Sequence, residues 1–128
     1  MIVDSSAVVA ILVREVDADH LANKLTGVPR PRMSAATYLE LSIVMENKGG
    51  PRAGYELDEL IAQTDVEIVP VTIEQAEAAR VAWRRFGKGN HPARLNFGDC
   101  FSYALAKTTG EPLLFKGNDF SQTDIEPA

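Results

Sequence analysis

Four acidic residues stand where the surrounding sequence gives no ordinary reason for a charge. Asp4 directly follows the apolar start of the chain, and Asp119 comes shortly after a run of leucine and phenylalanine. Glu40 has mostly apolar neighbours three and four positions away in a helical pattern, and Asp99 lies among aromatic residues. An ionised carboxylate taken out of water without a partner is strongly unfavourable, so each of the four must be paired, protonated or bound to a cation.

Basic residues are scarce beside these acids, and Lys116 is the one close exception. Carboxylates that are brought together without cationic partners repel one another, and a hard divalent metal is the usual remedy. The chain has one cysteine and no pair of histidines at metal-binding spacing. A set of oxygen ligands alone favours Mg²⁺ or Mn²⁺ over zinc.

Each acid also has a simpler interpretation when it is taken alone. Asp4 is placed to cap a helix, and Glu40 is able to reach solvent or an arginine. Asp99 follows Gly98 as an N-cap would, and Asp119 belongs to a Gly-Asn-Asp sequence that is typical of turns. The prediction of a metal site therefore depends on all four acids together.

The elements that must position these acids alternate between short strands and helices. We expect strands over residues 1–4, 66–71 and 112–115. We expect helices over residues 7–13, 17–25, 34–48, 72–86 and 98–109, a further helix from residue 51, and a loop over 87–94. Connections this long exclude hairpins, so the sheet is expected to be mainly parallel and covered on both faces. The predicted fold class is α/β, a three-layer α/β/α sandwich.

Three local expectations follow from the same patterns. The hydroxyls of Ser5 and Ser6 suit an N-cap for the first helix. Leu39 and Ile43, at helical spacing, are expected to face the core. In a parallel sheet Asp4 and Asp119 would emerge at the carboxyl ends of strands, where α/β proteins bind ligands.

Composition limits the class of protein. The chain has 128 residues, 45% hydrophobic and 24% charged, with a net charge of -5, which indicates one domain over residues 1–128 and excludes a disordered chain. No apolar run is long enough to span a membrane, and the start lacks the basic lead of a signal peptide. With Cys100 as the sole cysteine, no internal disulfide can form, so we expect a cytoplasmic protein.

A locally basic stretch precedes Asp99. No acid occurs between Ala78 and Gly98, whereas five basic residues do, and this favours a phosphate-binding rim within an acidic protein. The candidate RNA-binding residues are Arg85, Lys88 and Arg94. The aromatic residues in or beside this stretch either stack on bases or belong to the core or to a dimer contact: Trp83, Phe86 and Phe97.

Four segments together resemble a known family. The start Met-Ile-Val-Asp-Ser-Ser-Ala, residues 34–40 with their late glutamate, Leu-Asn-Phe-Gly-Asp-Cys at 95–100 and Leu-Leu-Phe-Lys-Gly-Asn-Asp-Phe at 113–120 are similar to PIN-domain proteins of the VapC toxin type. Each motif is weak alone. In this order and spacing they cover essentially the whole chain, so the resemblance is specific.

The resemblance implies an α/β/α sandwich that acts as an Mg²⁺- or Mn²⁺-dependent endoribonuclease, the toxin of a toxin–antitoxin pair. Asp4, Glu40 and Asp99 would be the three core acids and metal ligands, and Asp119 the fourth, more variable one. Ser6 would support the site by hydrogen bonding. A VapB-type antitoxin and a second copy of the chain would be the partners besides RNA. Metal-activated water would hydrolyse the phosphodiester, so no catalytic serine, cysteine or histidine is required.

Two other classes of protein also gather acids at strand ends. A receiver-type signalling module needs a phosphoacceptor aspartate at the end of a middle strand, and the strand over 66–71 leads into Thr72 with none. A phosphatase with a nucleophilic aspartate would have a second acid two positions after Asp4, where this chain has Ser6. A catalytically silent PIN-like binding protein stays open as an alternative.

Overall fold

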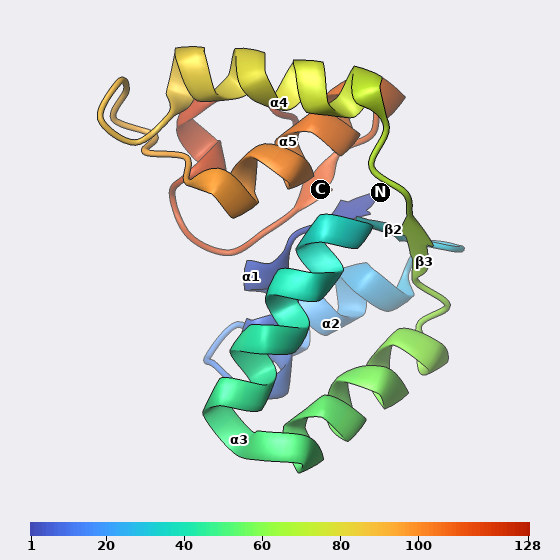
Figure 1. Cartoon of the computed structure of the whole chain (residues 1–128). Coiled ribbons are helices and arrows are strands. Elements are labelled where there is room, and N and C mark those ends of the chain that lie inside the picture. Colours follow the sequence, from blue (N-terminus) through green and yellow to red (C-terminus); the bar gives the residue numbers. More distant parts are fainter.

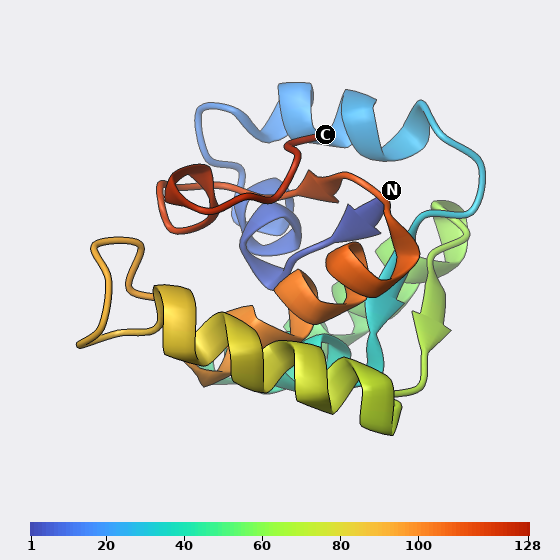
Figure 2. The ribbon, with the colours of Figure 1, turned by 90° about the horizontal axis from the view of Figure 1, so that it is seen from above.

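Four short parallel strands form the centre of the molecule in the computed structural model, which describes residues 1–128. The strands are β1 (Ile2–Val3), β2 (Arg32–Ser34), β3 (Glu67–Val69) and β4 (Leu113–Leu114), in the spatial order β3-β2-β1-β4. The helices are α1 (Ser5–Leu12), α2 (Ala18–Thr26), α3 (Ala35–Gln63), α4 (Ile73–Phe86) and α5 (Phe97–Thr109), followed by the 3-10 helix η1 (Phe120–Gln122). Helices lie on both sides of the sheet, as the views in Figures 1 and 2 show, so the predicted α/β/α sandwich is confirmed.

Two separate hydrophobic clusters fill the space on the two faces of the sheet. Because successive residues of a strand point to opposite faces, Ile2 and Leu113 pack with α4 and α5, whereas Val3 and Leu114 pack with α1, α2 and α3. All four side chains are almost completely buried. The central strands are therefore apolar throughout, as parallel strands covered on both faces must be.

The strand β2 has no counterpart among the predicted elements. It is only three residues long, and its place in the sheet depends on pairing with segments far away in sequence. The backbone N–H of Arg32 donates to the carbonyl of Met1 at 2.9 Å, and that of Glu67 donates to the carbonyl of Pro31 at 2.8 Å. Local pattern cannot reveal a strand that is stabilised mainly by such long-range bonds.

The long helix α3 bends where the sequence predicts a stop. Gly50 adopts φ 66°, outside the helical region, and Pro51 begins the second half of the helix. The buried face of the first half is formed by Thr37, Leu41 and Met45. The expectation for Leu39 and Ile43 was wrong: they lie on the opposite face and are 61% and 52% exposed.

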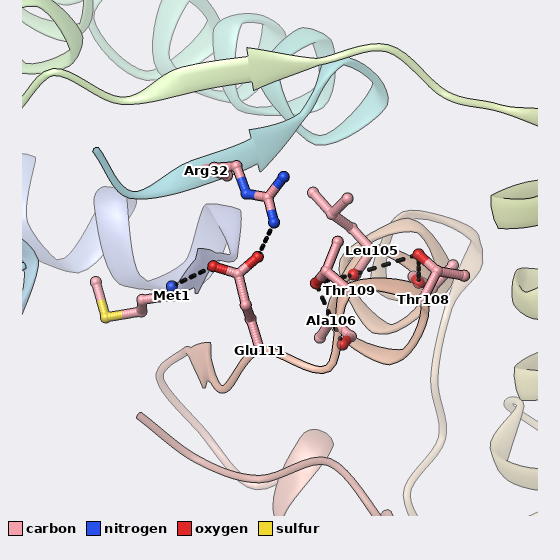
Figure 3. Close-up of polar contacts among 8 residues, drawn as sticks. Met1, Arg32, Leu105, Ala106, Thr108, Thr109 and Glu111 are labelled. Atoms are coloured by element: carbon pink, nitrogen blue, oxygen red, sulfur yellow. Dashed lines mark hydrogen bonds and ion pairs between the residues drawn. The ribbon is translucent and has the colours of Figure 1, made fainter. Parts of the chain in front are cut away.

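The amino ends of the strands carry a closed charge cluster, shown in Figure 3. The amino group of Met1 donates to Glu111 Oε1 at 2.7 Å, and the guanidinium of Arg32 pairs with the other carboxylate oxygen. Burial alone would raise the pKa of Glu111, but the hydrogen bonds from these two cations outweigh burial and lower it. The negative charge of Glu111 is therefore compensated within the fold.

None of the helices combines the length and the apolar content needed to cross a bilayer.

Candidate functional site

Asp4 lies at the carboxyl end of β1 and caps α1. Its side chain is 2% exposed, and its Oδ2 accepts hydrogen bonds from the backbone N–H of Ser6 at 3.0 Å and from the Ser6 hydroxyl at 2.6 Å. The carboxylate thus occupies the N-cap position, so the helix begins at Ser5. The prediction that Ser5 and Ser6 cap a helix starting at Ala7 was wrong, because the acid caps in their place.

Ser102 is a residue of the site that the sequence did not single out. Its hydroxyl donates to Asp4 Oδ1 at 2.6 Å, and the hydroxyl of Thr37 lies 3.2 Å from it. Ser102 and Thr37 are both 1% exposed. Its spacing could have indicated this role, because Ser102 follows Asp99 by three positions and therefore lies on the same face of α5. Asp4 is held from two helices at once, by Ser6 on α1 and Ser102 on α5.

Glu40 lies on the first half of α3, and its carboxylate packs against the start of α5. The hydroxyl of Ser5 donates to Glu40 Oε1 at 3.0 Å. A Cβ atom placed on Gly98 would lie only 1.8 Å from Glu40 Oε2. The absence of a side chain at Gly98 therefore allows Glu40 to approach the turn that carries Asp99.

Asp99 lies in the first turn of α5. Asn96 caps this helix by accepting from the Asp99 N–H at 2.8 Å, and Asp99 Oδ2 accepts from the Asn96 N–H at 3.0 Å. The interpretation of Asp99 as an N-cap was wrong, because Asn96 holds that position. Burial raises the pKa of Asp99 to about 7, and the nearby charges of Asp4, Asp119 and Glu40 add to this rise against the opposing effect of the Asn96 hydrogen bond.

Asp119 is exposed and directly precedes η1, in the segment that follows β4. The backbone of this segment is fixed at Lys116, whose N–H donates to the Ser6 hydroxyl at 3.0 Å. The ammonium group of Lys116 pairs with Glu15 and Asp17. The one cation close to the acids in the sequence is thus engaged with other carboxylates.

None of the four acids forms an ion pair, although half of the ion pairs in the molecule involve partly buried carboxylates elsewhere. Their hydrogen-bond donors are hydroxyls and backbone N–H groups. In this structure, no three of these carboxylates are arranged as a group that could hold a metal ion. Carboxylate oxygens whose negative charge is not compensated are nevertheless the type of ligand that a hard divalent cation prefers.

The candidate RNA-binding residues differ in how free their charges are. Arg85 lies 3.5 Å from Asp124 and stacks over the ring of Phe86, with 4.7 Å between its guanidinium carbon and the ring centroid. Lys88 and Arg94, in the loop between α4 and α5, are exposed and form no ion pair. This loop extends away from the body of the molecule (Figure 1). Phe86 itself is buried and belongs to the core.

Comparison with known proteins identifies the class. Residues 1–126 match the PIN domain. The chain is 52% identical over 125 residues to Ribonuclease VapC of Mycolicibacterium smegmatis, which covers 98% of this chain and 97% of that protein.

Solved structures share the fold. The crystal structure of VapC20 from Mycobacterium tuberculosis, described as a toxin that cleaves the sarcin–ricin loop, superposes with a TM-score of 0.79 at 21% identity and covers 99% of this chain and 97% of its own. A toxin–antitoxin complex from Klebsiella pneumoniae gives a TM-score of 0.70 at 14% identity, with 96% and 92% covered.

A parallel α/β/α sandwich with unpaired acids at the carboxyl edge of its sheet and this match in sequence define a PIN domain, and the chain belongs to that family. Its relatives of similar length place it among the VapC-type members. This family assignment excludes the alternative of a receiver-type signalling module.

Proposed function

We propose that the chain, as one domain over residues 1–128, is a metal-dependent endoribonuclease and the toxin of a toxin–antitoxin pair. Its site would consist of Asp4, Glu40, Asp99 and Asp119. The observation that carries the proposal is the position of Asp99, a half-buried carboxylate that has three other acids as charged neighbours and forms no ion pair, so that its pKa is raised to about 7. The relatives named as VapC ribonucleases support the same reaction class.

Mg²⁺ or Mn²⁺ is the cofactor we propose, with these four carboxylates as ligands. Such an ion, when bound, neutralises the phosphate, lowers the pKa of a water molecule and stabilises the leaving oxygen. Ser6 and Ser102 orient the Asp4 carboxylate by hydrogen bonds to its two oxygens. Asn96 fixes Asp99 in the same way through the capping box.

Binding of the substrate and partners is part of the proposal. Arg85, Lys88 and Arg94 would contact RNA phosphates, with Lys88 and Arg94 free for this purpose and Arg85 shared with Asp124. The partners would be an antitoxin of the VapB type, as the Klebsiella pneumoniae complex suggests, and a second copy of the chain. We place its action in the cytoplasm, where the RNA substrate is found.

The test is cleavage of total RNA by the purified protein with Mg²⁺, with Mn²⁺ and with a chelator. We expect cleavage with metal, none with chelator, and none with Asp99→Asn. Asp58→Asn, an exposed aspartate on the second half of α3, is the matched control and should cut like the wild type. Cleavage that ignores both the chelator and Asp99→Asn would refute the site, and a folded protein that never cuts RNA would leave the silent binding protein in its place.

A further inference from the structure

A pocket of about 510 Å³ opens between α4 and α5, next to the candidate site. Its volume lies within the range of small-molecule sites. The lining includes the side chains of Arg80, Trp83, Lys88, Asn96, Phe97 and Phe101, and it contains no acidic residue although the chain has 18. The pocket therefore suits a flat apolar group attached to an anion.

The aromatic walls of the pocket are exposed and yet held in place. Phe97 is 82% exposed at the first position of α5, and its ring meets that of Phe101 edge to face with 5.0 Å between centroids. Trp83 is 44% exposed, and its indole lies against Gly87, where a Cβ would come within 2.1 Å of a ring carbon. Two large aromatic surfaces thus face solvent, and each of them packs against a neighbouring residue.

Three polar side chains line the pocket, and their N–H donors have no acceptor within the chain. Arg80 and Lys88 form no ion pair, whereas Arg85 on the same helix as Arg80 is paired with Asp124. Asn96 uses its Oδ1 to cap α5, and its amide nitrogen makes no hydrogen bond within the chain. Aromatic surfaces beside unpaired cations are the combination that binds single-stranded nucleic acid.

We propose that this pocket is a subsite for one unpaired base of the RNA, which stacks on Phe97 and Trp83 while Arg80 and Lys88 contact the adjoining phosphates. The inference rests on the proposed function and adds the residues that would hold a base beside the acids. The first turn of α5 carries both Phe97 and Asp99, so a base in the pocket lies within one helical turn of the acids. The base therefore sets which phosphate is presented to the site.

Trp83 is the sole tryptophan and so reports directly on the pocket. The experiment titrates the Asp4→Asn protein, which should not cut, with a short single-stranded oligoribonucleotide in Mg²⁺ and follows tryptophan fluorescence. We expect quenching by the oligoribonucleotide and little by an oligomer of equal length that lacks bases. Phe97→Ala in the same protein should weaken binding by roughly 5- to 100-fold, and Phe97→Tyr should retain it.

Tyr55→Ala is the matched control, because Tyr55 is 72% exposed and lies on α3, outside this pocket. It should bind like its parent. If the wild type cuts RNA but Phe97→Ala binds unchanged and the fluorescence stays constant, the subsite is wrong and the proposed function survives. If RNA is neither bound nor cut, both fall. Quenching by an acidic peptide in place of RNA would assign the pocket to a protein partner and overturn the proposal.

Discussion

The two ends of the parallel sheet treat their carboxylates in opposite ways. At the amino ends, Glu111 is held by the Met1 amino group and by Arg32, and the two hydrogen bonds lower its pKa despite burial (Figure 3). At the carboxyl ends, burial and three neighbouring acids raise the pKa of Asp99 to about 7, and no cation opposes them. Both acids are partly buried, so the difference lies in the partners that the chain supplies.

This difference separates a stabilising cluster from a binding site. Pairing at the amino ends closes the charge within the fold, which leaves nothing for a ligand to satisfy. At the carboxyl ends, Lys116 is the basic residue nearest to these acids in the sequence, and its ammonium pairs with Glu15 and Asp17 instead. The negative charge is therefore free for the divalent cation that we propose, at the edge where parallel sheets bind ligands.

The largest expected effect is on activity at the carboxyl ends. Asp4→Asn keeps the size of the side chain and an acceptor oxygen for Ser6, but it puts an amide donor opposite the Ser102 hydroxyl and removes the charge. Because loss of a residue behind a metal ligand already costs 10- to 100-fold, we expect cleavage to fall by at least about 100-fold. RNA cleavage in Mn²⁺ and a urea midpoint measured on the same sample check this. Equal loss of stability and activity would contradict the role of a ligand.

Gly98→Ala should disrupt the candidate site at the carboxyl ends of the strands by a steric clash. The added methyl group occupies the place of the Glu40 carboxylate, which must swing away from α5. We expect cleavage to fall by about 10- to 100-fold. Stability should change little, since alanine favours the helix over glycine and the displaced glutamate can reach solvent. Gly110→Ala does not serve as a control, because Gly110 has φ 70° and would be strained. Activity equal to that of the wild type would show that the position of Glu40 is unimportant.

Glu111→Gln should have the reverse profile. It leaves Met1 and Arg32 without their shared carboxylate, so we expect the free energy of unfolding to fall by about 1–2 kcal/mol at pH 7. The lowered pKa means that the ionised form stabilises the fold above the ordinary pKa of a glutamate, and that this contribution disappears as the pH falls through the folded-state pKa. Urea titrations of both proteins at pH 7 and at acidic pH should therefore converge at low pH. A constant difference would reject the ion pairs as its cause.

The sequence predicted the fold class, which the structure confirms, whereas the four acids stay a predicted site, and the sequence did not indicate how they are held. Apolar runs and capping residues report local structure, and for this reason the helix capped by Thr72 was expected where it lies, with Thr72 accepting from the Gln75 N–H. The strand β2 and the contact of Ser102 with Asp4 join segments that are distant in sequence. Such contacts leave no periodic signal, and neither does the space at Gly98 that admits Glu40.

The smallest expected effect is on the free energy of unfolding and comes from the ionisation of Asp99. It tests directly whether the two ends of the sheet differ. Because the folded-state pKa of about 7 lies above the ordinary value of 3.8, ionisation of Asp99 destabilises the fold. The cost is absent below the ordinary pKa, grows as the pH rises, and is complete above the folded-state pKa.

Asp99→Asn removes this cost and retains an acceptor for the Asn96 N–H. After allowance for solvent screening of a half-buried group, we expect the variant to be more stable by about 1 kcal/mol at pH 8, and equal to the wild type near pH 4. Urea unfolding with a chelator present measures the difference, and adding Mg²⁺ should reduce it, because a bound cation stabilises only the wild type. A variant that is less stable at pH 8 would mean that the acids at this end of the sheet are structural, as Glu111 is at the other.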